Sequence, residues 1–108
     1  MPAPVEASVG CRLEAQADGR YRLAGDLGFG AAADVLQRGR EAFAGQSAVR
    51  VDLAEVSDAD SAGLAVILQW VGEARREGRD LRFANLPKRL ADLARISGVS
   101  DFVPVVPD

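Results

Sequence analysis

The sequence predicts an α/β fold in which a mostly parallel sheet is covered by helices, in the order β-β-α-β-α-β-α-β. Short β-branched segments alternate along the chain with longer segments of helical periodicity, which favours parallel strands joined by helical crossovers. The 108 residues, 48% hydrophobic and 27% charged, suffice for one domain with a single core. We expect that domain to span residues 10–108. Residues 1–9, with two prolines and no periodic pattern, are expected to form a flexible tail.

The first half of the chain predicts a hairpin and a helix. Two short strands are expected at 12–15 and 20–24, and the Asp-Gly pair between them is typical of a tight turn because glycine accepts a positive φ. A helix is predicted over 31–44, followed by a glycine that ends it. Gly39 weakens this helix, so its exact course is not fixed by the sequence.

The second half predicts the alternation of strands and helices. The segment 49–53 is β-branched and flanked by turn residues, and a helix is expected from about Ser61 to Glu77. A strand at 81–84 follows, and Pro87 starts a third helix. A last short strand over 102–106 is expected at an edge of the sheet, because prolines interrupt its hydrogen bonding.

Composition excludes several classes of function. A net charge of −3 does not favour nucleic acid as a partner, and the absence of histidine excludes the usual general-base triads and imidazole metal sites. The lone Cys11 predicts a reducing compartment. No signal peptide is recognisable, and the longest apolar run, Leu64–Leu68, is far shorter than the roughly 20 residues that span a bilayer. We expect a cytoplasmic protein that does not span a membrane and carries no cofactor or metal.

A candidate site lies where the strand over 49–53 is expected to run through an acidic turn into the next helix. Asp60 or Ser61 is placed to cap that helix, and the serine and the free helix amides are expected to be exposed. Glycine in a first turn costs up to ~1 kcal/mol against alanine, so something should benefit from its missing side chain. The pattern favours a docking or switching site over a catalytic one, with the candidate partner-binding residues Asp58, Asp60, Ser61, Ala62 and Gly63.

A second candidate surface comes from the helical wheel of the helix starting at Ser61. Gly63, Val66 and Trp70 fall on a stripe away from the centre of the aliphatic core face. Two interpretations stay open. Val66 and Trp70 either form a partner-binding surface or are covered by a neighbouring helix of the same domain.

Ser61 is also a possible phosphoacceptor. A phosphate there would add about −1.5 to −2 charge. The helix N-terminus would tolerate this charge, but Asp58 and Asp60 would repel it, and a docked partner would meet a desolvated dianion. The turn is therefore suited to a binding switch.

The chain resembles the STAS domain family over residues 11–106. The resemblance is carried mainly by a strand ending in Val-Asp-Leu at position 53, followed by Asp-Ser-Ala-Gly-Leu at 60–64 and a helix ending near Gly78. Weaker matches are Gly-Asp-Leu at 25–27 and the segment 97–102. The resemblance implies a STAS-like α/β fold and a non-enzymatic role.

Two branches of the family imply different partners. Anti-sigma-factor antagonists carry a second hydroxyl residue after the serine that their cognate kinase phosphorylates, and here Ala62 takes that place. The segments 60–65, 73–78 and 90–95 look more like the STAS subunit of the Mla-type phospholipid ABC transporter, which maintains outer-membrane lipid asymmetry. That resemblance implies a cytoplasmic accessory subunit, peripheral at the inner membrane, that contacts the transporter's ATPase subunit through Ser61 and its neighbours and reaches the permease indirectly. The alternative is an anti-sigma-factor antagonist that binds an anti-sigma factor kinase and is regulated by phosphorylation of Ser61.

A small dinucleotide-binding protein is a distant alternative. Gly28 to Ala33 matches G-x-G-x-x-A between a strand and a helix, and Asp52 closes the next strand about where a ribose-binding acid would lie. Such a site normally needs more parallel strands than this chain supplies. The carboxylates between 52 and 60 are interpreted as solvated side chains rather than a metal site.

Overall fold

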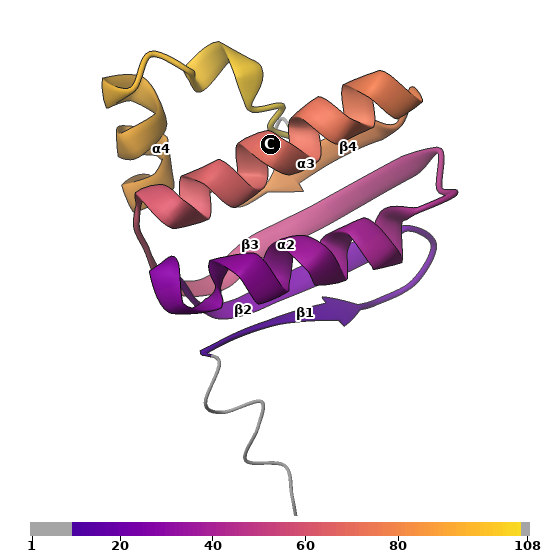
Figure 1. Ribbon diagram of the computed structural model, residues 1–108, viewed down its shortest axis with the longest axis horizontal. Coiled ribbons are helices and arrows are strands. Elements are labelled where there is room, and N and C mark those ends of the chain that lie inside the picture. Colours follow the sequence, from indigo (N-terminus) through magenta and orange to yellow (C-terminus); the bar gives the residue numbers. More distant parts are fainter. Residues whose placement is uncertain (1–9, 107–108) are drawn as a thin grey trace, which may run out of the picture.

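The computed structural model describes residues 10–106, and its α/β architecture confirms the predicted fold class (Figure 1). Its elements, in chain order, are β1 (Cys11–Ala15), β2 (Arg20–Leu27), α2 (Phe29–Phe43), β3 (Ala48–Ala59), α3 (Ser61–Glu77), β4 (Asp80–Ala84), α4 (Lys88–Ile96) and the 3-10 helix η1 (Ser100–Phe102). None of the helices in these residues combines the length and the apolar character needed to cross a membrane.

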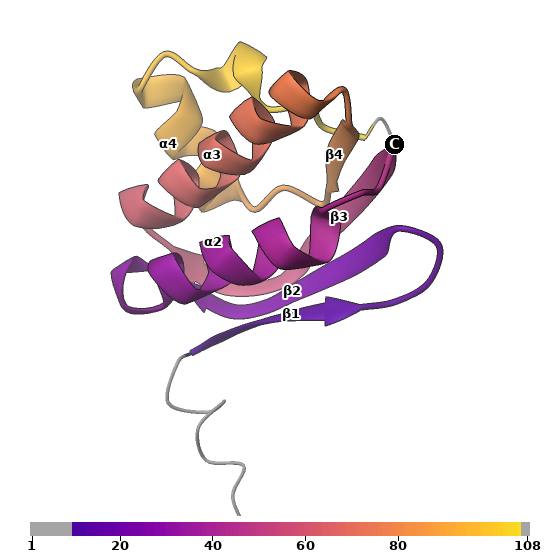
Figure 2. The same ribbon diagram turned by 45° about the vertical axis from the view of Figure 1, so that its right-hand side comes forward.

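The sheet has the strand order β1-β2-β3-β4. β1 and β2 form the predicted antiparallel hairpin, and Asp18 and Gly19 in its turn both have positive φ, 52° and 77°. β2, β3 and β4 run parallel, joined by crossovers that contain α2 and α3. The helices gather on one face of the sheet, with α2 and α3 side by side (Figures 1 and 2). The prediction of a mostly parallel, helix-covered sheet is confirmed.

The core lies between that face of the sheet and the helices, because side chains on the strands alternate between the two faces. The strand residues that point toward the helices are aliphatic or aromatic, whereas those that point away are mostly charged. The largest fully buried side chains are Trp70, Phe83, Leu23, Leu27, Leu53, Ile67, Leu90, Val35 and Val51.

Trp70 joins α3 to α2. Its indole Nε1 donates a hydrogen bond to the Leu36 carbonyl oxygen at 3.2 Å, and its ring meets Phe43 edge-on at 5.2 Å between centroids. A Cβ on Gly39 would lie 2.4 Å from the indole ring, so the glycine that weakens α2 allows the two helices to approach. Trp70 is 1% exposed and Val66 is 3% exposed. The hypothesis that these two residues form a partner-binding surface is therefore wrong. The alternative interpretation, that a neighbouring helix of the same domain covers them, is correct.

Several elements differ from their predicted extents, and β2 ends at Leu27 and α2 begins at Phe29. β3 continues to Ala59 through the segment expected to be an acidic turn, and shifts of register against β2 after Arg22 and Gly25 mark where the longer strand accommodates extra residues. The expected last strand is a single bridge between Phe83 and Val105, because Pro104 has no N–H to extend a ladder. The predicted tail at residues 1–9 lies outside the described residues.

Candidate partner-docking site

The predicted site residues lie at the carboxyl ends of β2 and β3, where α2 and α3 both begin, at the left of Figure 1. A hollow of about 470 Å³ opens there. Its lining includes Asp26, Phe29, Asp58, Asp60 and Arg89. In parallel α/β sheets, this edge is where crossover loops leave space for a ligand or partner.

Asp60 connects the starts of two helices with one carboxylate. Its Oδ1 accepts from the backbone N–H of Ala62 at 2.8 Å and of Gly63 at 3.3 Å, which caps α3 as predicted. Its Oδ2 accepts from the backbone N–H of Phe29 at 3.0 Å, at the first residue of α2. These bonds, with that from Phe29 as the largest effect, hold the pKa of Asp60 below its ordinary value of 3.8.

Replacing Asp60 by alanine is expected to lower Tm by about 5 °C or more at neutral pH, because three backbone N–H groups lose their acceptor. Asp60→Asn keeps a capping oxygen but loses the charge, so we expect a smaller fall. Since the folded pKa lies below 3.8, the contribution of the charge is complete above about pH 5 and is lost as the pH falls through the folded pKa. The gap between wild type and Asp60→Asn should therefore shrink in acid, measured by urea unfolding. A gap that stays constant down to about pH 3 would contradict this assignment.

Ser61 is exposed at the first residue of α3, and its hydroxyl forms no hydrogen bond with any residue of the described segment. Ala62 beside it is half-buried. Gly63 is buried, and a Cβ there would lie 2.2 Å from the Leu27 carbonyl oxygen. The expected benefit from its missing side chain is real but intramolecular, because it lets α3 pack on the end of β2. Ser61 is thus the accessible member of the motif.

Charge around the hollow is mixed. Asp58, predicted in a turn, lies on β3 opposite Asp26 of β2, and both side chains are exposed. Arg89, in the first turn of α4, donates from Nε to the Ala59 carbonyl oxygen at 3.1 Å and thereby holds α4 against the end of β3. Its charge also favours the ionised form of Asp60. A partner entering the hollow would therefore meet two exposed carboxylates, whereas Ser61 lies outside the lining of the hollow.

Sequence reasoning missed Phe29 as a surface residue. Its side chain is 85% exposed at the start of α2, beside the Asp60 carboxylate that its own N–H contacts. The only signal in the sequence is a large apolar residue between two glycines, a pattern that also matches the glycine motif at residues 28–33. Single exposed apolar side chains are common on protein surfaces, and Phe29 is of interest because it lines the hollow beside Asp60.

The dinucleotide-binding arrangement does not form. Asp52 lies in the middle of β3 rather than at its end, and its Oδ1 accepts from Asn85 Nδ2 and from the Ala54 N–H, both at 2.9 Å. Residues 10–106 contain no group of three or more side chains that could hold a metal ion. Burial, with a smaller effect of Asp26, raises the pKa of the Cys11 thiol to about 11, so this thiol is unreactive near neutral pH.

A family model identifies the protein family to which the chain belongs. Residues 12–107 match the family model described as "Mlab, STAS domain". The chain belongs to the STAS domain family. The resemblance inferred from the Asp-Ser-Ala-Gly-Leu motif is thereby confirmed. STAS domains are in general non-enzymatic regulatory or accessory domains that act through protein–protein interactions.

Solved structures share the STAS fold at low sequence identity. A candidate anti-sigma factor antagonist from Thermotoga maritima superposes with a TM-score of 0.74 at 15% identity, covering 91% of this chain and 86% of that chain. The anti-sigma factor antagonist SpoIIAA in its unphosphorylated form gives 0.68 at 15% identity, covering 91% and 89%. The Bacillus SpoIIAA in its phosphorylated form gives 0.66 at 15% identity, covering 91% and 92%.

A membrane protein contains the same STAS fold as one part of its chain. The murine anion transporter Solute Carrier 26 family member A9 matches with a TM-score of 0.67 at 14% identity, covering 87% of this chain but 17% of the transporter. No curated protein matches the sequence. These structural likenesses, at 14–15% identity, establish the fold alone.

Proposed function

We propose that this STAS domain is a non-enzymatic accessory subunit that binds and supports the ATPase of a phospholipid ABC transporter involved in outer-membrane lipid asymmetry. The observation that carries the proposal is the exposed Ser61 followed by Ala62 rather than by a second hydroxyl. The match to the family model described as "Mlab, STAS domain" supports the same choice. The protein would act in the cytoplasm, held at the inner membrane through the ATPase and its permease.

The docking site has the chemistry of a protein–protein contact. Phe29 supplies an apolar anchor, Ser61 a small polar surface that lets another backbone approach, and Asp58 an exposed carboxylate at the rim. An apolar centre with a polar rim is the usual composition of such interfaces. The complementary surface on the ATPase would present an apolar depression for Phe29 and a basic side chain toward Asp58 and Asp26.

An anti-sigma-factor antagonist is the second candidate. The free, exposed hydroxyl of Ser61 at a helix N-terminus favours it, because a kinase needs an accessible acceptor and the helix start tolerates the added charge. Similarity to both the unphosphorylated and the phosphorylated forms of SpoIIAA supports a phosphorylated state on this fold. In that case, Asp58 and Asp60 would be the groups that repel the phosphate.

Affinity purification of the tagged protein from its own host, followed by mass spectrometry, distinguishes the two candidates. We expect recovery of an ABC ATPase together with a membrane permease, with Ser61 unmodified. Recovery of a serine-kinase-like anti-sigma factor, with phosphate on Ser61, would contradict the transporter proposal and establish the second candidate.

A further inference from the structure

The face of the sheet opposite the helices is an open, charged surface. Figures 1 and 2 show the helices on the other face, and within residues 10–106 no helix covers this one. Its charged side chains, exposed or half-buried, come from all four strands, and arginine is the commonest among them. They include Arg12 and Glu14, Arg20 and Arg22, Arg50 and Asp52, and Asp80 and Arg82.

Three of these arginines stand side by side. The strand register pairs Arg20 with Arg50 and Arg50 with Arg82 across β2, β3 and β4. Neighbouring strands lie about 4.8 Å apart, and like charges directly opposite each other destabilise a sheet. Arg82 bonds Asp80 at 3.0 Å, but among the described residues the guanidinium groups of Arg20 and Arg50 form no ion pair or hydrogen bond. The arginine row is therefore incompletely neutralised.

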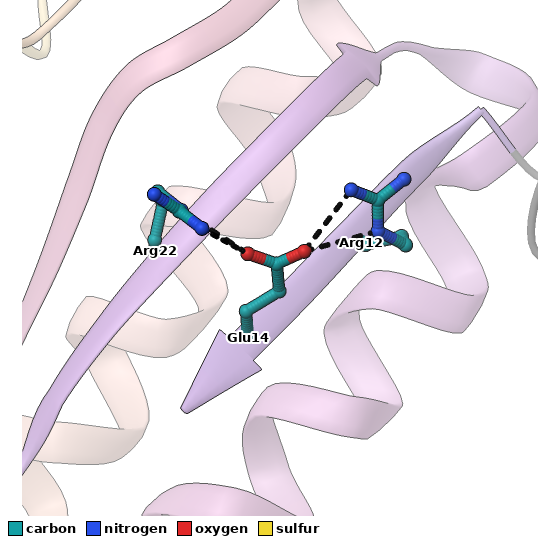
Figure 3. A network of polar contacts seen from close by, with 3 residues as sticks. All are labelled: Arg12, Glu14 and Arg22. Carbon is teal, nitrogen blue, oxygen red and sulfur yellow. Dashed lines mark hydrogen bonds and ion pairs between the residues drawn. The ribbon is translucent and has the colours of Figure 1, made fainter. Parts of the chain in front are cut away.

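The adjacent part of the same face is neutralised in a different way. Glu14 of β1 lies between Arg12 and Arg22 and binds both, at 3.0 Å and 2.7 Å (Figure 3). Glu14, and to a smaller extent Asp52 opposite Arg22 on β3, raise the pKa of Arg22. Each arginine there has a carboxylate of the domain within reach. The contrast singles out Arg20 and Arg50, whose guanidinium groups lack a carboxylate partner within residues 10–106.

A hollow of about 210 Å³ adjoins the arginine row at the amino ends of the parallel strands. Three arginines and two aspartates line it: Arg20, Arg50 and Arg82, with Asp18 and Asp80. The hollow lies at the opposite end of the parallel strands from Ser61, because β2 and β3 run from the arginine row to the docking site. A ligand in this hollow would leave the Ser61 surface free.

We propose that this open sheet face, centred on Arg20, Arg50 and Arg82, is a second docking surface that takes an acidic segment of a partner protein. Carboxylates on such a segment would pair with Arg20 and Arg50 and relieve the repulsion within the row. Guanidinium groups suit this role because they bind carboxylates through two parallel hydrogen bonds. The domain would then bridge two proteins, one at each end of its parallel strands.

The distribution of charge favours a protein segment over an anionic membrane. Asp18 and Asp80 line the same hollow as the arginines, and Glu14 and Asp52 lie on the adjacent part of the same face. A membrane surface carries negative charge throughout and would be repelled by these carboxylates, as by the net charge of −3 of the chain. A peptide places its carboxylates individually, so it can contact the arginines and avoid the acids.

Titration of the isotope-labelled protein with a peptide that carries a few glutamates separated by neutral residues, followed by amide NMR spectra, tests the proposal. At about 50 mM salt, shifts should be confined to the arginine row and its neighbours, and affinity should fall at about 150 mM. Arg50→Glu should weaken binding about tenfold or more, and Arg50→Gln by less. Arg76→Glu is the matched control, since Arg76 is exposed on α3 and its reversal changes net charge equally. Spectra without peptide establish that each variant is folded.

Three results would overturn the proposal. Equal weakening by Arg76→Glu would mean that the peptide responds to net charge alone. Shifts at the Ser61 end of the domain would place the acidic segment there instead. Arg50-dependent sedimentation with phosphatidylglycerol vesicles, without peptide shifts, would assign the surface to a membrane. None of these measurements depends on the ATPase, so their failure would leave the proposed function standing.

Discussion

Replacing Trp70 by alanine is expected to lower the free energy of unfolding by about 3–5 kcal/mol. The side chain is 1% exposed and carries both an edge-on contact with Phe43 and a hydrogen bond to the backbone of α2. Truncation removes these contacts and leaves a cavity between α2 and α3 that Gly39 has no side chain to fill. Urea unfolding followed by circular dichroism measures the loss, since the variant lacks the tryptophan used for fluorescence.

Two controls make the Trp70 result specific. Trp70→Phe should cost less, because a ring remains while the hydrogen bond to Leu36 is lost. Gln69→Ala, at the exposed neighbouring position, should change stability by no more than about 0.5 kcal/mol. A loss below about 1 kcal/mol for Trp70→Ala would contradict the structural role and return the residue to the candidate surface.

Ser61→Arg is expected to abolish co-purification of the ATPase without unfolding the domain. The residue is exposed, so the larger side chain projects into solvent and leaves the core unchanged. In a complex, however, it would occupy the space of the partner and bring a cation to a helix N-terminus, where positive charge is unfavourable. Co-purification measured beside the thermal unfolding curve separates loss of binding from loss of fold.

The matched control for Ser61→Arg is Ser47→Arg. Ser47 is also an exposed serine, but it lies between α2 and β3, at the far end of α2 from Phe29. The control variant should bind the ATPase as wild type does. Retained binding by Ser61→Arg would place the contact elsewhere on the domain and remove the main support for the proposed docking site.

Local sequence patterns predicted the order of strands and helices, because each depends on periodicity and on turn residues next to it. For this reason, the helix Ser61–Glu77 and its cap by Asp60 could be predicted from the sequence. The burial of Trp70 against α2 could not be predicted, because a helical wheel does not show where a second helix packs. The second role of Asp60 was also out of reach, because the N–H of Phe29 belongs to a distant part of the chain. The length of β3 depended on register shifts against β2 that leave no clear pattern in either strand.

The position of Asp60 has a consequence for how this surface can evolve. One carboxylate holds the first turns of both helices, and the neighbouring Gly63 leaves room for the backbone of β2. A mutation at either residue alters the architecture together with the surface, so neither is free to adapt to a new partner. Phe29 and Ser61 lie beside them with exposed side chains. If this surface binds a partner as proposed, Phe29 and Ser61 are the positions that can change with the partner while the fold stays the same.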